Sequence, residues 1–530
     1  MTTDPARRPE ARAARAAASV ALALCFACSG SADDAPRMNV LLVTLDTTRP
    51  DRMSCYGGAP GLTPTLDALA AEGTRFERAV STAGITPMSH ASILTGLNNF
   101  THGMRVFYSP DVSHRLKDVV DTFPEVLQRQ GYRTAARVSS YPVSAHYGLD
   151  QGFDDFESGV DVDALDLEAQ QSHSTSWDTG GRSNTQRRGD FTTDSALAWL
   201  DANGEAGPWC LWLHMFDVHD YSLVPPAAFA RERGIEYPGP GTRLSPSDRV
   251  QWRERMYDPE LAFMDAQLGR VIAWLRESGQ LERTVVVVTA DHGQGLSDGL
   301  RRHGWMKHRL LYDWSVRVPL IVRVPGIGGG AVVDSQVRTI DIAPTVVDAL
   351  RVGVRQPMEG DSLLRLMRGE ADDAPRVAYA DALNDYDAHA PPPERLPPGQ
   401  YDNLYMACDG RWKLIWHERN PDASQLYDLL KDPDELENLY RTDHPRVAPL
   451  MQYLTDRRVW DVEPPGSGSV APDVGRLREL GYIGAEPEDT APEDTVPAGT
   501  VPGNAPPVDD GAGPPAAGRT DGGDAVRGGR

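Results

Sequence analysis

Cysteine is scarce in this chain, and its few cysteines form no recognisable framework. There are five in 530 residues. Cys25 and Cys28 lie in an apolar N-terminal run, whereas Cys55, Cys210 and Cys408 are scattered and show no CxxC or CxxH spacing. Disulfide-rich domains and cysteine-ligated zinc sites both need cysteines at short, regular spacings. The sequence therefore excludes a disulfide scaffold and a cysteine zinc cluster.

Positive charge is also in the minority. The chain has 53 Lys and Arg against 76 Asp and Glu, which gives a formal net charge of −23. A protein that binds nucleic acid needs a basic surface to neutralise the phosphates. We therefore expect no nucleic-acid partner.

Long hydrophobic runs are missing too. The N-terminal stretch "AAASVALALCFAC" follows four arginines between positions 7 and 15 and is too short to span a bilayer comfortably. Cys28, after Ala27, resembles a bacterial lipoprotein cysteine. Residues 1–28 are predicted to be a signal or lipoprotein peptide of an exported protein, which is either a cell-envelope lipoprotein or periplasmic or secreted. Any membrane contact would be through that lipid anchor. The alternative is a cytoplasmic protein with an Ala-rich N-terminal helix.

The rest of the chain alternates between apolar strands and capped helices. "NVLLVTLDTTRPD" (39–51), "WCLWLHMFDVHD" (209–220) and "TVVVVTADHG" (284–293) are apolar runs that end in polar residues. Such runs are typical of strands that are buried on both faces of a parallel sheet. The alternation predicts an α/β fold with a doubly wound, mostly parallel sheet flanked by helices, in a catalytic domain over residues 38–350.

The pattern changes after this domain. The short segments "RVAYAD", "NLYMACDG", "RWKLIWH" and "QLYDL" predict a small antiparallel sheet in a C-terminal α+β subdomain, residues 351–483. Residues 484–530 are rich in Pro, Gly and acidic residues and predict a disordered tail. Residues 158–190 are polar and aperiodic, and we expect a long surface loop that lines the site.

The segment "ITPMSHASILTG" (85–96) places a hydroxyl at the start of a helix. Thr86 precedes Pro87, a residue favoured at the first position of a helix. Unpaired backbone N–H groups and the helix dipole attract anions to such a position. The Thr86 hydroxyl could attack a sulfur or phosphorus centre if a metal lowered its pKa. The alternative is a threonine that only caps the helix.

Asp46 and the pair Asp291-His292 follow two of the apolar strands. Because ligands bind at the carboxyl ends of strands in open α/β sheets, we expect these side chains to meet. The alternative for Asp46 is a turn aspartate that caps the next helix. Two carboxylates, one imidazole and the Thr86 hydroxyl can hold one divalent cation. This set predicts a metal-dependent hydrolase or transferase of an anionic ester and does not distinguish sulfur from phosphorus.

These segments resemble the sulfatase family of the alkaline-phosphatase superfamily. The resemblance also rests on "HGWMKHRLLYDWSVRVPLIVRVPG", "TIDIAPTVVDAL" and "KLIWHERNPDASQLYDLLKDPDELENL", and it covers residues 38–455 in order. It implies a sulfatase-like fold and a hydrolase acting on sulfuric ester bonds, or on phosphoric ester bonds. It also implies one divalent metal ion, Ca²⁺ in the family, with Mn²⁺ or Zn²⁺ as alternatives.

The nucleophile position departs from the family. Sulfatases carry a Cys or Ser, matured to formylglycine, in a C/S-x-P-x-R element. Here Thr86 occupies the nucleophile position and His90 the arginine position. Because threonine cannot be matured by that route, no formylglycine is expected. The family's first pair of metal aspartates is Asp46-Thr47 here, with one carboxylate missing.

Histidines replace other family residues as well. His308 stands where the family has a substrate-binding lysine, and the adjacent Lys307 is the alternative for that role. His303 matches the preceding His-Gly, and His219 matches a histidine near a strand end. The resemblance thus implies catalytic Thr86, His90, His219 and His308 and substrate-binding His303 and Lys307. We expect these histidines to titrate near neutrality and to act as general acids, although they could also be ordinary loop residues.

Three functions remain open on these residues. The first is hydrolysis of sulfate esters. The second is a phosphodiesterase or a phosphoglycerol- or phosphoethanolamine-type transferase, because the departures resemble lipoteichoic acid synthases and phosphoethanolamine transferases, in which Thr is the direct nucleophile. The third is a non-catalytic, glycan-binding pseudoenzyme. The expected partner is a sulfated or phosphorylated small molecule, glycan or lipid headgroup.

Overall fold

The computed structural model describes residues 37–107, 113–159, 185–219, 224–237, 246–305, 307–372, 374–384, 402–462 and 469–470. The predicted leader (1–28), most of the predicted surface loop (158–190) and the predicted tail (484–530) lie outside these residues. Within the described part, no helix combines the length and the apolar character needed to cross a bilayer.

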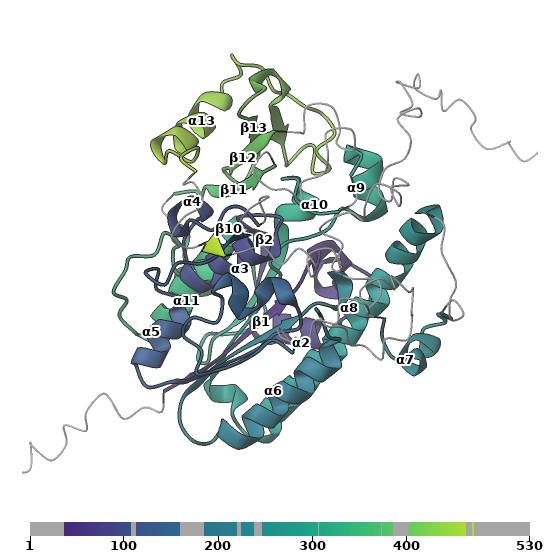
Figure 1. Ribbon diagram of the computed structural model, residues 1–530, viewed down its shortest axis with the longest axis vertical. Helices are drawn as coiled ribbons and strands as arrows, with labels where there is room; N and C mark the ends of the chain where they lie inside the picture. Colours follow the sequence, from purple (N-terminus) through teal and green to yellow (C-terminus); the bar gives the residue numbers. More distant parts are fainter. Residues whose placement is uncertain are drawn as a thin grey trace, which may run out of the picture.

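A large mixed sheet forms the centre of the molecule (Figure 1). Its nine described strands lie in the order β10-β2-β8-β7-β1-β6-β4-β5, with β9 beside β2. The strands are β1 (Asn39–Leu45), β2 (Thr74–Val80), β4 (Arg133–Arg137), β5 (Asp155–Glu157), β6 (Trp209–Met215), β7 (Thr284–Thr289), β8 (Arg317–Arg323), β9 (Ala331–Val333) and β10 (Val337–Arg338). Only β8 runs antiparallel to its neighbours β7 and β2 within this sheet. The expectation of a mostly parallel sheet is confirmed.

The central strands are buried on both faces, which explains their unbroken apolar sequences. Val40 and Leu42 of β1 belong to one core, whereas Leu41, Val43 and Leu45 belong to the other. Neighbouring side chains on a strand point to opposite faces, so both faces need a cover of helices.

Helices supply both covers. The first core includes α3 (Thr86–Thr95), α5 (Phe123–Arg129) and α11 (Ile342–Ala349). The second includes α2 (Pro64–Glu72), α6 (Gly189–Asn203) and α8 (Pro246–Glu277). Short helical segments complete the described fold: α4 (Asn99–His102), α7 (Ala227–Glu232), α9 (Leu296–His303), α10 (Asp313–Val316), α12 (Leu364–Met367) and α13 (Val447–Asp456).

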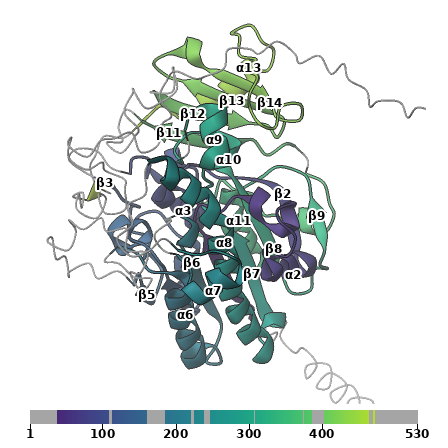
Figure 2. The same cartoon turned by 90° about the vertical axis from the view of Figure 1, so that its right-hand side faces the viewer.

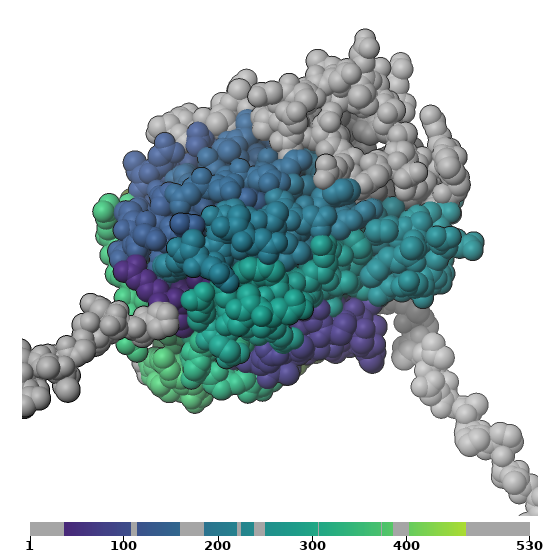
Figure 3. Space-filling model, turned by 90° about the horizontal axis from the view of Figure 1, so that it is seen from below, coloured from purple at the N-terminus to yellow at the C-terminus, as the bar shows by residue number. Residues whose placement is uncertain are grey.

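A separate antiparallel sheet follows in the C-terminal part of the chain. Its order is β11-β12-β13-β14, formed by β11 (Ala378–Leu383), β12 (Asn403–Cys408), β13 (Trp412–His417) and β14 (Gln425–Asp428). Figures 1 and 2 show this sheet at one end of the molecule, beside α9 and α10. The predicted antiparallel sheet is confirmed, whereas the boundaries at 350 and 483 stay predictions. Seen from the other end, purple, blue and teal segments that are far apart in the sequence lie side by side (Figure 3).

A buried lysine of the C-terminal sheet pairs with two carboxylates, one of them at the start of α10. Lys413 of β13 is fully buried, with its Nζ 3.0 Å from Asp313 Oδ1 and 2.7 Å from Glu435 Oε1. The backbone N–H of Asp313, at the start of α10, donates to Glu435 Oε2 at 2.6 Å. Although burial would lower the pKa of Lys413, the carboxylates of Asp313 and Glu435 raise it, so the lysine stays charged. This ion triad holds the end of the segment that connects α9 to α10.

Replacing Lys413 by Met should strongly destabilise the protein, because Asp313 and Glu435 would lose their buried counter-charge. Breaking a buried ion pair from one side costs about 3–5 kcal/mol. We expect a clear fall in the urea midpoint of the full chain. Lys431, which is exposed, provides the matched control. Lys431→Met should leave the midpoint nearly unchanged, and an equal fall in both variants would contradict the role given to the triad.

Candidate metal centre and anion pocket

Asp46 stands directly beyond the carboxyl end of β1. Its backbone N–H donates to the carbonyl of Met215, at the end of β6, at 2.9 Å. One carboxylate oxygen, Oδ2, lies 3.2 Å from Nε2 of His214. The other oxygen, Oδ1, is buried and has no hydrogen-bond partner among the described residues. Burying a polar atom without a hydrogen-bond partner lowers the stability of the folded protein unless a ligand interacts with that atom.

Asp291 follows β7 at the same edge of the sheet. Its Oδ1 accepts hydrogen bonds from the backbone N–H of Thr47 at 3.0 Å and from that of His292 at 2.8 Å. Thr47 adopts a left-handed backbone with φ of 50°, which brings its N–H to the carboxylate. Oδ2 of Asp291 is buried without a hydrogen-bond partner in the described part of the chain.

His292 and Thr86 complete the cluster. Nδ1 of His292 lies 2.9 Å from the carbonyl of Gly293, which can only accept, so Nδ1 carries the proton. Nε2 therefore keeps its lone pair, and it lies 3.2 Å from Oγ1 of Thr86. Thr86 is the first residue of α3, whose N-cap is Ile85, so Thr86 is not the capping residue, and its hydroxyl contacts His292 instead. The alternative of a purely capping threonine is therefore wrong.

These groups fit a divalent cation. Asp46, Asp291 and His292 each offer a ligand atom, and the three atoms lie within 4.8 Å of one another. Burial, and then the neighbouring charge of Asp291, raises the pKa of Asp46 well above its usual range. Two buried carboxylates with two unpartnered oxygens are what a bound cation would stabilise, and the oxygen and imidazole donors suit Ca²⁺, Mn²⁺ or Zn²⁺.

Two more histidines lie beside this centre. The ring of His308 is 4.8 Å from that of His292 and 5.4 Å from that of His219. His219 closes the short helical turn Asp217–His219 after β6 and stacks on Phe216 at 4.2 Å. Nδ1 of His308 donates to the carbonyl of Gly84 at 2.9 Å. The structure thus places His308 beside His292, and His219 beside His308.

Basic side chains surround these rings. The positive charges of Lys307 and Arg253 act on His219, and that of Arg309 acts on His308. Arg253, from α8, and Arg309 were missed by the sequence analysis. Arg309 could have been suspected because it directly follows His308 in the sequence. Nothing in the sequence indicates that Arg253, on α8, lies near this site. Positive charge from three side chains therefore lies near the candidate metal centre, which favours an anion there.

Gly84 fixes the approach of the Arg309 segment to α3. Its carbonyl accepts from Nδ1 of His308 and from the backbone N–H of Arg309, the latter at 3.2 Å. A Cβ atom at position 84 would lie 2.9 Å from that backbone nitrogen and 2.4 Å from Oγ of Ser315. Only glycine permits this close contact.

The comparisons with known proteins agree with this architecture. The family model described as Sulfatase matches residues 38–352. The chain belongs to the sulfatase family. A second model, described as N-sulphoglucosamine sulphohydrolase, C-terminal, matches residues 301–460. This sulfatase-family chain is therefore a hydrolase of sulfuric or related anionic esters, as the resemblance implied.

Several relatives cover most of this sulfatase-family chain. It is 24% identical over 509 residues to the N-acetylglucosamine-6-O-sulfatase of Bacteroides thetaiotaomicron, covering 79% of this chain and 86% of the relative. It is 24% identical to the arylsulfatase of Clostridium perfringens, covering 76% and 90% of the two chains. These identities are too low to carry a substrate over directly.

Solved structures show the same fold. A protein in complex with its substrate D-glucosamine-2-N,6-O-disulfate has a TM-score of 0.63 at 22% identity, with coverage of 81% of this chain and 99% of the other. The phosphonate monoester hydrolase of Agrobacterium radiobacter has a TM-score of 0.59 at 22% identity, with coverage of 82% and 100%. The fold therefore accommodates both sulfur and phosphorus chemistry.

The charge state of the histidines in this sulfatase-family chain differs from the sequence-based expectation. Burial, reinforced by neighbouring imidazoles, lowers the pKa values of His214, His219 and His308 well below the usual range. These rings are therefore neutral near pH 7 rather than half-titrated. Positive charge near these rings comes from Lys and Arg.

The contacts of His303 are with residues outside the candidate metal centre. Its Nδ1 accepts from Trp314 Nε1–H at 2.8 Å, and its Nε2 lies 3.1 Å from the carbonyl of Glu435. The ring stacks on Tyr312 with centroids 3.6 Å apart. Burial lowers its pKa to about 4. Both nitrogens are engaged by the protein, which favours the alternative of a structural histidine over substrate binding.

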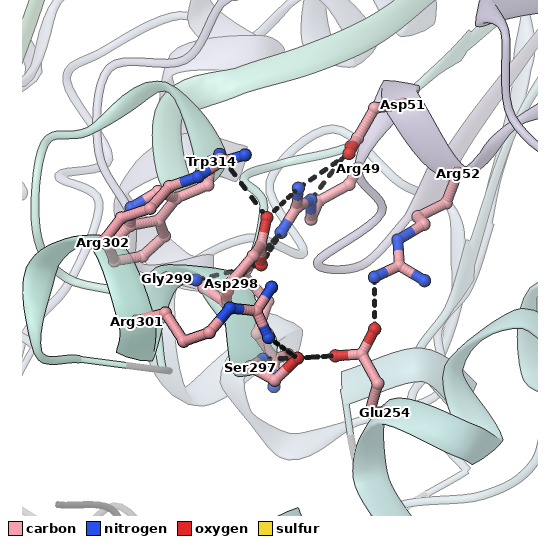
Figure 4. A network of polar contacts seen from close by, with 12 residues as sticks. Arg49, Asp51, Arg52, Glu254, Ser297, Asp298, Gly299, Arg301, Arg302 and Trp314 are labelled. Carbon is pink, nitrogen blue, oxygen red and sulfur yellow. Dashed lines mark hydrogen bonds and ion pairs between the residues drawn. The ribbon is translucent and has the colours of Figure 1, made fainter. Parts of the chain in front are cut away.

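A buried arginine, Arg49, joins the loop after β1 to the segment after β7 (Figure 4). Arg49 follows β1, and its guanidinium pairs with Asp51 at 2.7 Å and with Asp298 of α9 at 2.7 Å. It also donates to the carbonyl of Gln294 at 3.2 Å. Although burial would raise the pKa of Asp298, the hydrogen bonds from Arg49 lower it. The loop after β1 is thereby held against the loop after β7.

Metal binding should stabilise the folded protein through Asp46. After treatment with EDTA, addition of Ca²⁺, Mn²⁺ or Zn²⁺ should raise the Tm of wild-type protein. A ligand at 100 times its Kd stabilises by about 2.7 kcal/mol. Asp46→Asn should lose this response, and without metal it should be no less stable than wild type, because one of two buried like charges is gone.

The control for this measurement is Asp443→Asn, at an exposed position, which should keep the full metal response. An undiminished response in Asp46→Asn would contradict the assignment of Asp46 as a ligand.

Proposed function

We propose that this protein is a metal-dependent hydrolase of sulfate esters that uses Thr86 as its nucleophile. The observation that carries the proposal is the distance of 3.2 Å between Oγ1 of Thr86 and Nε2 of His292, beside the carboxylates of Asp46 and Asp291. The names of its relatives, which include a glucosamine sulfatase and an arylsulfatase, favour a sulfated glycan or small molecule as substrate.

Asp46, Asp291 and His292 would hold the divalent cation, with Thr86 as a further oxygen. When bound, such an ion lowers the pKa of a coordinated hydroxyl and polarises an ester oxygen. The remaining work falls to residues of the chain. The start of α3 lies beside the candidate metal ligand His292, where the helix dipole would favour an anionic ester, and Lys307 and Arg309 add positive charge.

The reaction then takes two displacements. The Thr86 oxygen attacks sulfur, the bond from sulfur to the leaving oxygen breaks, and a proton passes to that oxygen. A bound anion raises the pKa of the adjacent His219 and His308, so one of them can carry this proton. Water next attacks the sulfur of the Thr86 ester, which releases sulfate and restores the hydroxyl.

A second candidate function is phosphoryl chemistry. Thr86 cannot be matured to formylglycine, so the nucleophile is an unmodified hydroxyl, as a phosphodiesterase or a phosphoglycerol- or phosphoethanolamine-type transferase would use. The phosphonate monoester hydrolase among the structural neighbours supports this alternative. A transferase would differ only in the second step, where an alcohol rather than water would attack the Thr86 ester.

Turnover separates these functions. Purified full-length protein would be assayed in a metal series on an aryl sulfate, an aryl phosphate, an aryl phosphodiester and an aryl phosphonate. Metal-dependent turnover of the sulfate alone is expected. Turnover of the phosphorus esters alone would replace the proposal by its second candidate. Binding of sulfate or phosphate without turnover of any ester would favour a glycan-binding pseudoenzyme.

Replacing Thr86 by Ala should abolish turnover, because no other hydroxyl contacts His292 among the described residues. Loss of a nucleophile lowers kcat by about 10³-fold or more. Thr95→Ala, at the other end of the same buried helix, is the matched control and should keep the wild-type rate. A Thr86→Ala protein with wild-type kcat would remove Thr86 from the mechanism.

A further inference from the structure

Two histidines behind the metal centre are used in a way that the resemblance did not imply. His90 and His214 are both fully buried, and their ring centroids lie 5.1 Å apart. Both rings make hydrogen bonds to other groups of the chain. Their nitrogens contact the groups that carry the proposed chemistry.

The hydrogen bonds of His214 define its tautomer. Its Nδ1 lies 3.3 Å from the backbone nitrogen of Ser139, which can only donate. Nδ1 therefore holds the lone pair, and the proton of the neutral ring is on Nε2. That N–H donates to Oδ2 of Asp46 at 3.2 Å. His214 thus orients Asp46 so that its unpartnered Oδ1 is the oxygen left for the cation.

His90 has the opposite tautomer. Its Nδ1 lies 2.8 Å from the carbonyl of Thr86, which can only accept, so the proton is on Nδ1. The same nitrogen lies 3.6 Å from Oδ2 of Asp291. Nε2 then accepts from the hydroxyl of Thr44 at 3.1 Å, and Thr44 Oγ1 itself accepts from Trp212 Nε1–H at 2.9 Å. Hydrogen bonds therefore run from Trp212 through Thr44 and His90 to the backbone carbonyl of Thr86, the proposed nucleophile.

We propose that His90 and His214 are positioning residues of this centre. His214 fixes the carboxylate of Asp46, and His90 fixes Thr86 through its carbonyl, each by a defined and opposite tautomer. This inference rests on the proposed function and refines it, because it moves His90 from the substrate to the support of the helix start. Groups that orient metal ligands from behind in this way influence metal affinity and rate.

The two tautomers give a crossed test. The side-chain amide of Asn places its N–H near Nδ1 of the imidazole it replaces, whereas that of Gln places it near Nε2. At position 214 the donor is Nε2, so His214→Gln should keep most of the function and His214→Asn should lose it. At position 90 the donor is Nδ1, so His90→Asn should keep most of the function and His90→Gln should lose it.

The two positions should fail in different measurements. His214→Asn should weaken Mn²⁺ affinity, measured by calorimetry on the full chain, by about 10–100-fold. His90→Gln should lower kcat by about 10–100-fold with little change in KM or in Mn²⁺ affinity, since it misplaces Thr86 rather than a carboxylate. A role in packing alone would make Asn and Gln equally harmful at each position, and that result would overturn the inference.

A measurement without metal or substrate separates this inference from the proposed function. In metal-free protein with ¹⁵N-labelled histidine, NMR should show His214 protonated at Nε2 and His90 at Nδ1, assigned by loss of each signal in its variants. Any other pair of tautomers overturns the inference. Wild-type protein that shows these tautomers but neither binds Mn²⁺ nor turns over an ester would overturn the proposed function, and with it the role given to both rings.

Discussion

The centre of this protein depends on two carboxylates that are buried at one edge of a sheet without a counter-charge from the chain. Asp46 and Asp291 are completely buried, and each keeps one oxygen without a hydrogen-bond partner among the described residues. Burial, and then the charge of Asp291, opposes ionisation of Asp46 and raises its pKa. A divalent cation removes this conflict, so the same feature that is unfavourable in the protein alone favours metal binding.

The surrounding structure holds these groups in place. Parallel pairing of β1 with both β6 and β7 brings the two strand ends to the same edge. Arg49 holds the loops beyond the strands together, and the Lys413 triad attaches the C-terminal sheet to the segment that carries Lys307, His308 and Arg309. Rigid supports of this kind pre-organise a site more effectively than flexible loops do.

The buried histidines near the centre share one physical property. Burial keeps these rings neutral, so their contribution is directional hydrogen bonding rather than charge. His90 donates to the carbonyl of Thr86 and His214 to the carboxylate of Asp46, while the rings of His219 and His308 lie beside each other. Positive charge near these rings comes instead from Arg253, Lys307 and Arg309.

The sequence alone determined the fold class and the convergence of four distant residues. Unbroken apolar strands predict burial on both faces, and the carboxyl-edge rule then brings Asp46, Asp291, His292 and Thr86 together, because strand direction is encoded in the alternation of strands and helices. The resemblance to the sulfatase family also predicted the order in which these elements follow one another along the chain.

The tertiary structure decided the roles of the individual histidines. The sequence does not distinguish the roles of His90, His303 and His308. In the structure, His90 bonds to the start of α3, His303 stacks on Tyr312, and His308 lies beside His292. The charge of Arg253, on α8, acts on His219, and the sequence of that helix does not indicate this proximity. Tautomer, charge state and access to substrate depend on which groups from distant segments surround a side chain, and only the packed structure specifies those neighbours.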